Sequence, residues 1–372
     1  MIINNHQSCI RCLMDTTDPE LTFNEQGVCN HCIEAEIELP KHKFSSEEEQ
    51  ANLRAIYDKI KSDSKGQKYD SLIGLSGGVD SSYVTHLAHQ MKLTPLIVHF
   101  DNGWNSEKSV ANIKNLVDKC GFDLETYVIN WPEFKDLQRS FFKAGVVDIE
   151  ILSDHAIMAT MFQLRKKYKI RNVLSGSNYV TEHGMPNAWL WRKQDLTNIR
   201  GIQKKFGTRK IKDFPTLNSV QFQLIKMFGL GGNYIEILNH INYSKSMAMD
   251  VLQKEYGWVY YGGKHYESTF TKFYQAYVLP VKFGYDKRKV HLSALIRNGE
   301  ITREQGLAEL AKPAYDPQEL RIDKEYVLKK LGFSEAEFDQ IMAAPPKSHL
   351  DYPSDEWIFN IWRKLKPVLK KG

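Results

Sequence analysis

The chain has 372 residues and a mass of 43.1 kDa; 42% of its residues are hydrophobic and 26% are charged. This composition is typical of a folded protein with more than one hydrophobic core, and it excludes a disordered or fibrous chain. The formal net charge of +5 is too small to favour nucleic acid as the main partner, although it suits phosphorylated ligands. The start shows no secretory signal, and no run of 18 apolar residues occurs, so we expect a cytoplasmic protein without a membrane partner.

Four of the five cysteines form two CxxC pairs, Cys9 with Cys12 and Cys29 with Cys32, with sixteen residues between the pairs. This spacing is typical of a tetrahedral four-thiolate zinc site, because each CxxC turn directs two sulfurs to one point. Turn formers and alternating apolar residues between the pairs predict a short ribbon hairpin. Since four thiolates leave no open position on the metal, we predict a structural zinc that stabilises a ribbon domain over residues 1–44.

Short apolar runs alternate with helical patterns after residue 69. The runs that we interpret as strands are 71–75, 96–100, 124–129 and 173–174, and the helices between them are 82–91, 107–119, 134–143 and 154–167. This alternation predicts an α/β fold with a doubly wound, mostly parallel sheet that binds ligands at the carboxyl ends of its strands. We assign this domain to residues 45–215.

The strand pattern fades beyond residue 215. Helical periodicity recurs at 244–256, 302–311, 324–331, 334–343 and 354–366, with aromatic-rich segments between that we interpret as loops. The sequence therefore predicts a mainly helical domain over residues 216–372 that binds the substrate or a partner.

The most informative segment, SGGVDSS, connects the first predicted strand to the helix after it. Its predicted nucleotide-binding residues are Ser76, Gly77, Gly78, Asp80, Ser81 and Ser82. Two glycines let backbone N–H groups turn inward, and the helix N-terminus adds the positive end of its dipole, so the segment can bind an anion. Asp80 is placed to hold Mg²⁺ or to orient the loop. The alternative is a Gly-Ser turn that happens to open a helix. The Walker A pattern is absent, so the lysine that grips phosphates in kinases is missing.

SGGxDS after a strand resembles the pyrophosphate-binding loop (PP-loop) of the N-type ATP pyrophosphatases. That superfamily includes the asparagine, GMP and NAD synthetases and the tRNA sulfur-insertion enzymes. The resemblance implies a Rossmann-like domain in which ATP is cleaved between its α- and β-phosphates and an oxygen of the substrate is adenylated. Asp101, Gly176 and Asn178 lie at the ends of later predicted strands, where we expect them to contact ATP.

The cysteine count bears on which member of the superfamily this is. Enzymes that insert sulfur into tRNA also combine this loop with zinc ribbons, but they need a sulfur relay, and only Cys120 remains after the zinc site. The chain has Ile2 where an N-terminal cysteine nucleophile would stand, and no GxCxG elbow, so ammonia must come from a separate glutaminase or from solution. A tRNA-thiolation enzyme and a nucleotide-binding adaptor without turnover stay as alternatives.

Four segments in the second half carry a narrower resemblance: YGW at 256–258, YGGKHYES at 261–268, FTKFYQ at 270–275 and KFGYDKR at 282–288. Together with the cysteine pairs and SGGVDSS, they resemble the N-acetyl sugar amidotransferases of bacterial surface-polysaccharide synthesis, the WbpG and PseA types. The resemblance implies that an acetamido group of an N-acetylated, nucleotide-linked sugar becomes an acetamidino group, in lipopolysaccharide O-antigen or related glycan synthesis. It also implies ATP and Mg²⁺, a glutaminase subunit and an ammonia-delivery subunit like a histidine-pathway synthase.

The same segments supply candidates for catalysis beside Asp80. We predict that Lys264 contacts phosphate and that His265 and Glu267 handle protons of the attacking ammonia. Further phosphate or substrate candidates are Asp154, His155, Lys272 and Lys282. For each of these, a structural or solvated side chain is the alternative.

Overall fold

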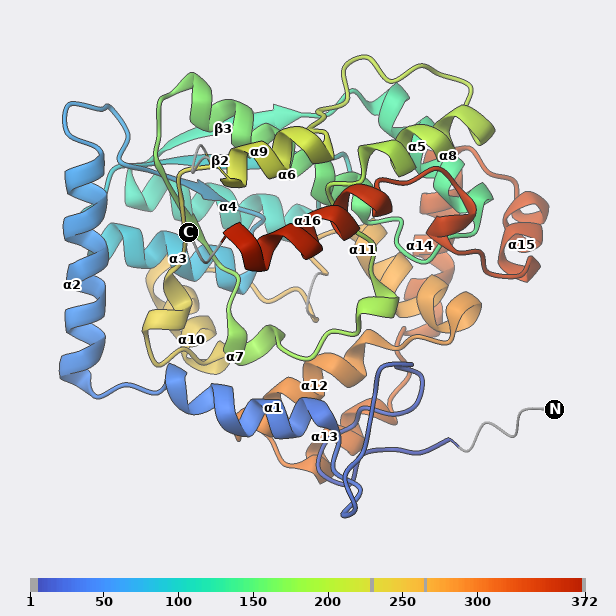
Figure 1. Ribbon diagram of the computed structural model, residues 1–372, viewed down its shortest axis with the longest axis horizontal. Helices are drawn as coiled ribbons and strands as arrows, with labels where there is room; N and C mark the ends of the chain where they lie inside the picture. The colour runs from blue at the N-terminus through green and yellow to red at the C-terminus, as the bar shows by residue number, and fades with distance from the viewer. Residues whose placement is uncertain (1–5, 228–230, 264–265, 370–372) are drawn as a thin grey trace.

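The computed structural model describes residues 6–227, 231–263 and 266–369 (Figure 1). In this part of the chain, five parallel strands form one sheet in the order β3-β2-β1-β4-β5. The strands are β1 (Ser71–Gly74), β2 (Pro95–Asp101), β3 (Asp123–Val128), β4 (Asn172–Ser175) and β5 (Asn233–Glu236). The predicted α/β fold with a parallel sheet is therefore confirmed.

Helices cover both faces of the sheet, as a doubly wound fold requires. The helices nearest the sheet are α2 (Ser46–Asp63), α3 (Val79–Gln90), α4 (Glu107–Cys120), α6 (Ile151–Lys167) and α10 (Lys245–Tyr256). Successive strand residues point to opposite faces. Ile73 and Ile97 pack with α3 and α4, whereas Leu72 and Leu96 pack with Leu164 of α6.

The strand order places a topological switch point between β1 and β4. The chain passes from β1 to β2 and β3 on one side, and then returns to pair β4 with the other side of β1. In such sheets, ligands bind in the crevice where the strand order reverses. The loop after β1 and the segment after β4 therefore meet where a nucleotide is expected.

A second core, rich in aromatic residues, joins the sheet domain to the C-terminal half. Its elements are α5 (Trp131–Ala144), α8 (Leu196–Phe206), α11 (Thr269–Phe273), α14 (Pro317–Leu331), α15 (Glu335–Ala343) and a π-helical segment, η4 (Tyr274–Phe283). Phe141 and Phe273 are fully buried there. The expectation of aromatic-rich loops is wrong over residues 269–283, because these aromatic side chains pack inward and the backbone satisfies its hydrogen bonds as helix.

The region that holds the four paired cysteines, residues 6–44, packs on the C-terminal half. It contains α1 (Asn30–Glu38) and the 3-10 turn η1 (Leu39–His42), with antiparallel bridges between Ser8 and Asp15 and between Phe23 and Cys29. It contacts α12 (Lys287–Asn298) and α13 (Arg303–Leu310), which lie beside it at the bottom of Figure 1.

The other elements are connectors and the last helix. They are α7 (Tyr179–Glu182), η2 (Asn187–Trp189), α9 (Ser219–Met227), η3 (Ile237–His240), η5 (His349–Asp351) and α16 (Glu356–Leu369). Over the described ranges, no helix combines the length and apolar character that crossing a bilayer requires.

Candidate functional site

The predicted phosphate loop lies where β1 ends and α3 begins. Gly77 adopts φ +82°, and a Cβ placed there would lie 2.6 Å from the carbonyl oxygen of Ser109. The Ser76 hydroxyl accepts from the N–H of Gly78 (3.2 Å) and lies 3.2 Å from the Ser81 hydroxyl. The backbone is thus turned in a way that only glycine permits at Gly77, and the loop stands at the N-terminus of α3, which attracts anions.

The segment after β4 packs closely against the first turn of α3. A Cβ on Gly176 would lie 2.9 Å from the carbonyl carbon of Asp80 and 3.0 Å from the nitrogen of Ser81. Asn178 caps α7 by accepting from the N–H of Thr181 (2.9 Å), and it donates to the carbonyl of Gly176 (3.2 Å). The structure therefore brings the predicted ATP-binding residues of β1 and β4 together at the switch point. Ser82 is fully buried, and its hydroxyl has no hydrogen-bond partner within the described ranges.

Asp80 is oriented by a tyrosine that sequence reasoning missed. The hydroxyl of Tyr243 donates to Asp80 Oδ1. Burial and the Asp80 carboxylate raise the pKa of Tyr243 far above its ordinary value, so this hydroxyl keeps its proton and remains a donor. Tyr243 lies between η3 and α10 in a stretch without a motif, so the sequence offered no signal for it.

Two stretches that we call the crossing segment, residues 256–263 and 266–268, contact the phosphate loop from the C-terminal half. The indole Nε1 of Trp258 donates to the carbonyl of Gly77 (3.0 Å). A Cβ on Gly78 would lie 3.3 Å from the hydroxyl of Tyr261 and 3.4 Å from Oε1 of Glu267. Burial, Glu267 and Asp80 raise the pKa of Tyr261 far above its ordinary value, so it stays a hydroxyl donor beside the loop.

Backbone hydrogen bonds join the C-terminal end of the crossing segment to the residues that follow β2. Ser268 forms an antiparallel bridge with Asn105, and the carbonyl of Glu267 accepts from the N–H of Ser106 (2.8 Å). The structure thus places the predicted catalytic Glu267 at the loop. Lys264 and His265 lie outside the described residues, so their predicted roles stay predictions.

Asp101 stands at the end of β2, beside a hollow of about 460 Å³ between α4 and strands β2 and β3. Its Oδ1 accepts from the N–H of Gly103 (2.8 Å) and from Nδ2 of Asn105 (3.2 Å). Ile113 and Val117 supply part of the apolar lining. An apolar hollow with a few polar groups at its mouth is a common form of ligand site, and this one lies one strand from the phosphate loop.

Asp154 and His155, at the start of α6, have structural contacts. Asp154 pairs with Lys193 (2.9 Å). His155 is fully buried; its Nε2 accepts from the N–H of Leu217 (3.2 Å), which fixes a neutral ring whose Nδ1 donates to the carbonyl of Lys193 (2.7 Å). Burial also lowers the pKa of His155. The ring therefore links two loops and has no nitrogen left for a substrate.

Lys272 and Lys282, the two remaining phosphate or substrate candidates, contact residues of the C-terminal half. Lys272 Nζ pairs with Glu319 (2.6 Å) and lies 4.6 Å from the ring centre of Tyr315. Lys282 Nζ donates to the carbonyls of Ile341 (2.6 Å) and Ala344 (2.7 Å), at the C-terminus of α15. Both lysines thus contact elements of the C-terminal half, and Lys282 does so as a cation at a helix C-terminus, which is a stabilising arrangement.

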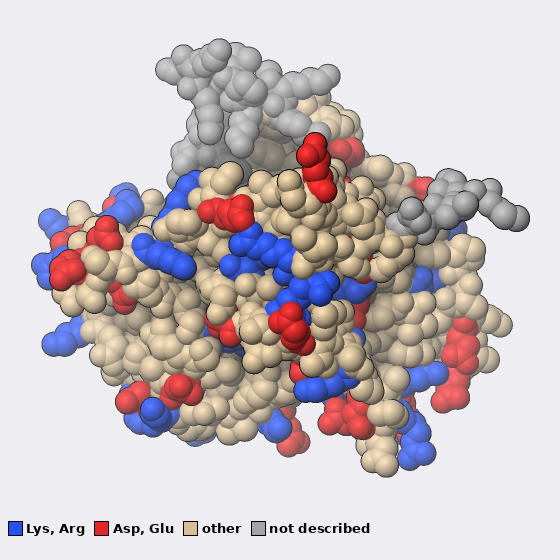
Figure 2. Space-filling model, turned by 90° about the horizontal axis from the view of Figure 1, so that it is seen from below, with Lys and Arg blue, Asp and Glu red and all other residues tan. Residues whose placement is uncertain are grey.

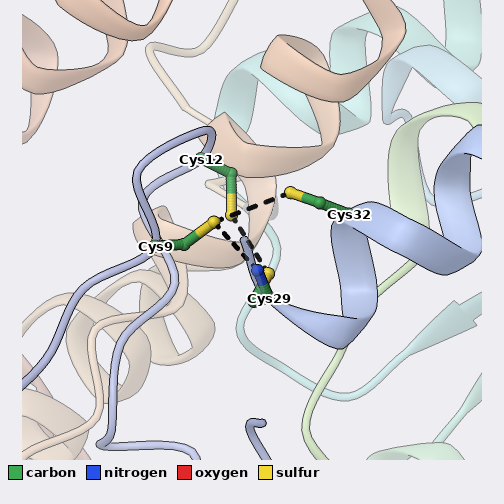
Figure 3. Close-up of side chains that lie close together, drawn as sticks. All are labelled: Cys9, Cys12, Cys29 and Cys32. Atoms are coloured by element: carbon green, nitrogen blue, oxygen red, sulfur yellow. Dashed lines mark hydrogen bonds between the residues drawn. The ribbon is translucent and has the colours of Figure 1, made fainter. Parts of the chain in front are cut away.

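The four predicted zinc ligands converge (Figure 3). All four cysteines are fully buried, and their Sγ atoms lie within 4.8 Å of one another. The Cys9–Cys32 and Cys12–Cys29 sulfur distances are 3.9 and 3.7 Å. Tetrahedral zinc with Zn–S bonds of about 2.3 Å requires sulfurs about 3.8 Å apart, so the donor set fits this ion.

A buried arginine gives a second test of that fit. Arg297 Nη2 donates to Cys12 Sγ (3.4 Å), and within the described ranges its Nε and Nη1 have no hydrogen-bond partner. Hydrogen bonds from Cys29 and Cys32 lower the pKa of the Cys12 thiol to about 6, and Arg297 acts in the same direction. A four-thiolate zinc centre carries two negative charges, which would balance this guanidinium.

The comparison with protein families finds a match in the C-terminal half. Residues 267–366 match the family described as LPS biosynthesis protein WbpG-like, C-terminal domain. This confirms, over those residues, the resemblance to WbpG-type proteins that the sequence indicated. The comparison with curated proteins finds no match.

Solved structures include weakly similar synthetases. NMN synthetase from Francisella tularensis has 17% identity and a TM-score of 0.31 over 58% of this chain and 94% of its own. NH3-dependent NAD synthetase from Campylobacter jejuni has 16% identity and a TM-score of 0.29, covering 56% and 94%. NAD+ synthetase from Burkholderia pseudomallei has 12% identity and a TM-score of 0.29, covering 61% and 92%. These scores are too low to carry an argument, so the fold assignment rests on the sheet itself.

Proposed function

We propose that this protein is an ATP-dependent amidotransferase that forms AMP and pyrophosphate and converts an acetamido group of an N-acetylated sugar to an acetamidino group. One observation carries the proposal. The WbpG-like match begins at Glu267, and Oε1 of Glu267 lies 3.4 Å from the position that a Cβ on Gly78 of the phosphate loop would take. The glycine and serine loop accounts for the nucleotide chemistry, and the C-terminal domain supports the sugar substrate.

The proposed reaction has two steps. The amide oxygen attacks the α-phosphorus of ATP, so that an O–P bond forms, the bond to the β-phosphate oxygen breaks, and pyrophosphate leaves. Ammonia then attacks the carbon of the resulting O-adenylyl imidate, AMP departs with the former amide oxygen, and one proton is lost. An amide needs this activation because its carbonyl carbon is a poor electrophile, whereas AMP is a good leaving group.

The residues of this chain have separate tasks in that scheme. The loop N–H groups and the hydroxyls of Ser76 and Ser81 would hold the departing pyrophosphate, since preorganised donors stabilise charge that develops in a transition state. Asp80, fixed by Tyr243, would hold Mg²⁺, which supplies charge neutralisation at the phosphates. The hollow beside Asp101 would receive the adenosine.

Ammonia would come from a separate glutaminase subunit, with a delivery subunit like a histidine-pathway synthase. The cysteines support an external source. Four converge on the proposed zinc site, and burial raises the pKa of Cys120, the fifth. A thiol with a raised pKa is a poor nucleophile, which also disfavours the sulfur relay of a tRNA-thiolation enzyme. We place the reaction in the cytoplasm, in lipopolysaccharide O-antigen or related glycan synthesis, with a nucleotide-linked sugar as substrate.

The test uses purified protein with Mg-ATP, an ammonium salt and a panel of acetamido sugars, free and nucleotide-linked. We expect AMP and pyrophosphate in equal amounts, and a product whose mass differs from the substrate by the exchange of O for NH and which carries a new positive charge. Release of ADP would contradict the assignment of the loop. A requirement for tRNA and a sulfur donor would favour thiolation, and nucleotide binding without turnover would favour an adaptor.

A further inference from the structure

Residues 176–189, which we call the β4 arm, connect the nucleotide site to the region that holds the four paired cysteines. The arm begins with Gly176 and Asn178, the two predicted ATP-binding residues that follow β4, and Gly176 packs against the first turn of α3. Farther along the arm, α7 contacts α12 and η1 in the lower part of Figure 1. The two ends of the arm therefore meet two different parts of the molecule.

The four-cysteine region, residues 6–44, contacts the β4 arm at several points. The contacts are a stack of the His42 ring on the Tyr179 ring (5.2 Å between centres), a hydrogen bond from Asn187 Nδ2 to Glu20 (2.8 Å) and one from the Trp189 indole to the carbonyl of Thr17 (3.4 Å). Trp189 is fully buried in the same apolar cluster as the four cysteines. Because these contacts are spread along the arm, the region restricts the position of the whole arm.

Arg297 of α12 joins the cysteines to the β4 arm directly. Its Nη2 donates to Cys12 Sγ (3.4 Å). A Cβ on Gly184, which has φ +81°, would lie only 2.6 Å from Nη1, the other terminal nitrogen of this guanidinium. The guanidinium is therefore packed against the backbone of the arm at a position that only glycine permits. A bound zinc would hold the four sulfurs at one point, and with them the sulfur that Arg297 contacts.

The charge of the four-cysteine region argues against another role of small zinc domains, the binding of nucleic acid. Residues 6–44 contain seven Asp or Glu and three Lys or Arg, a net charge of −4. On the face drawn in Figure 2, which is the lower side of Figure 1, Lys and Arg lie among Asp and Glu. Proteins that bind nucleic acid need an excess of cations to face the phosphates. The contacts of this region with the β4 arm are therefore a better guide to its role than its outer surface.

We propose that Arg297 and the β4 arm couple the predicted zinc site to the nucleotide site, so that the chain binds ATP more tightly with the metal than without it. In the metal-bound chain, Cys12 keeps Arg297 in place, and Arg297 holds the arm at Gly184. The arm in turn places Gly176 and Asn178 beside the phosphate loop. Such coupling is reciprocal, because each ligand changes the affinity of the other by the same factor. The inference rests on the proposed binding of ATP at this loop, but not on the proposed sugar substrate.

The experiment measures by calorimetry the affinity of the full chain for α,β-methylene-ATP, an analogue that cannot be cleaved between these two phosphates. The chain is compared with zinc bound and after a chelator has removed the zinc, and circular dichroism checks that both samples are folded. We expect the affinity to fall by at least about fivefold without zinc, the lower end of the usual coupling between two sites. The zinc affinity, measured by competition with a chelator, should rise by the same factor when the analogue is present.

Two variants test the β4 arm in chains that keep all four cysteines. Gly184→Ala directs a methyl group into Arg297 and should weaken analogue binding by at least about fivefold. Its control, Gly299→Ala, carries the backbone cost alone, since Gly299 has φ +80° and nothing lies within 4 Å of its Cβ position. Arg297→Met should act like Gly184→Ala, and its control, Arg288→Met, removes an arginine of the same helix that pairs with Asp286 (2.7 Å). Both controls should bind the analogue normally.

The results that contradict this inference differ from those that contradict the proposed function. Equal affinity of the folded chain with and without zinc overturns the inference alone, as does a chain that takes up no zinc but binds the analogue. If zinc removal unfolds the chain, the two variants decide, and binding like that of their controls overturns the inference. A zinc-loaded chain that does not bind the analogue contradicts the proposed function, and the inference fails with it.

Discussion

Replacing Gly77 with alanine tests the geometry of the phosphate loop most directly. Gly77 has φ +82°, and the new Cβ would lie 2.6 Å from the carbonyl oxygen of Ser109. Ser109 cannot move away easily, because it is fully buried in the first turn of α4 and its hydroxyl donates to the carbonyl of Ser106 (2.9 Å). The loop must therefore shift, or α4 must.

The loss of folding stability in Gly77→Ala has two separate sources, the backbone conformation and the steric overlap. A left-handed backbone costs alanine about 1–2 kcal/mol, and forcing an atom into a packed site costs about 1–3 kcal/mol more. Gly66 separates the two, since it has φ +75° and nothing lies within 4 Å of its Cβ position. Gly66→Ala should therefore show only the first cost, and Gly77→Ala should show both.

The assay compares the free energy of unfolding in urea, ATP affinity by calorimetry and AMP formation for the two variants. We expect Gly66→Ala to keep normal ATP affinity and AMP formation. Gly77→Ala should lose about 1–3 kcal/mol more stability and at least about tenfold in AMP formation, because small displacements of catalytic groups are costly. Equal stability of the two variants, or normal AMP formation by Gly77→Ala, would refute the described loop.

Three further changes probe other parts of the molecule. Tyr243→Phe removes the donor to Asp80 and should slow AMP formation about tenfold, the effect of losing a hydrogen bond to a charged group, with little change in the thermal midpoint. Cys9→Ser should lower bound zinc and the thermal midpoint by several degrees, whereas Cys120→Ser should keep the metal. Burial lowers the pKa of His349 to about 4, so the folded chain binds fewer protons than the unfolded chain, and stability falls as pH drops from about 6.5 to about 4. His349→Asn should reduce that slope by up to about 1.4 kcal/mol per pH unit.

Each of these expectations has an outcome that contradicts it. An unchanged rate in Tyr243→Phe would mean that Asp80 needs no fixed donor. Zinc content equal to that of the unmodified chain in Cys9→Ser would remove the four-thiolate site. A slope in His349→Asn identical to that of the unmodified chain would show that this ring titrates alike in the folded and unfolded states.

Most of the sheet domain could be predicted because β1, β2 and β4 contain short buried apolar runs, whereas β3 alternates apolar and polar residues. The predicted strand at 96–100 lies within β2, and the predicted helix at 107–119 nearly coincides with α4. β5 was missed because its sequence, Asn-Tyr-Ile-Glu, is short and polar at both ends, so only pairing with β4 makes it a strand. The domain boundary near residue 215 stays a prediction.

The site could be predicted in part, wherever a motif marks local backbone geometry. The cysteine pairs and SGGVDSS have fixed spacings, so the convergence of the sulfurs and the turn at Gly77 follow from sequence. The contacts of Tyr243 and Trp258 join positions more than 160 residues apart, and no local pattern encodes them. Only the packing of the C-terminal half on the sheet brings them to the loop.

The hydrogen bond from the Trp258 indole to Gly77 makes the nucleotide site a joint product of two halves of the chain. A chimaera that keeps the sheet domain and takes its second half from a relative would lose this hydrogen bond to the loop unless the new half supplied an aromatic N–H at the same place. An exchange of the C-terminal half between relatives is therefore constrained at this junction, because the contacts of residues 256–263 and 266–268 with the loop have to be kept.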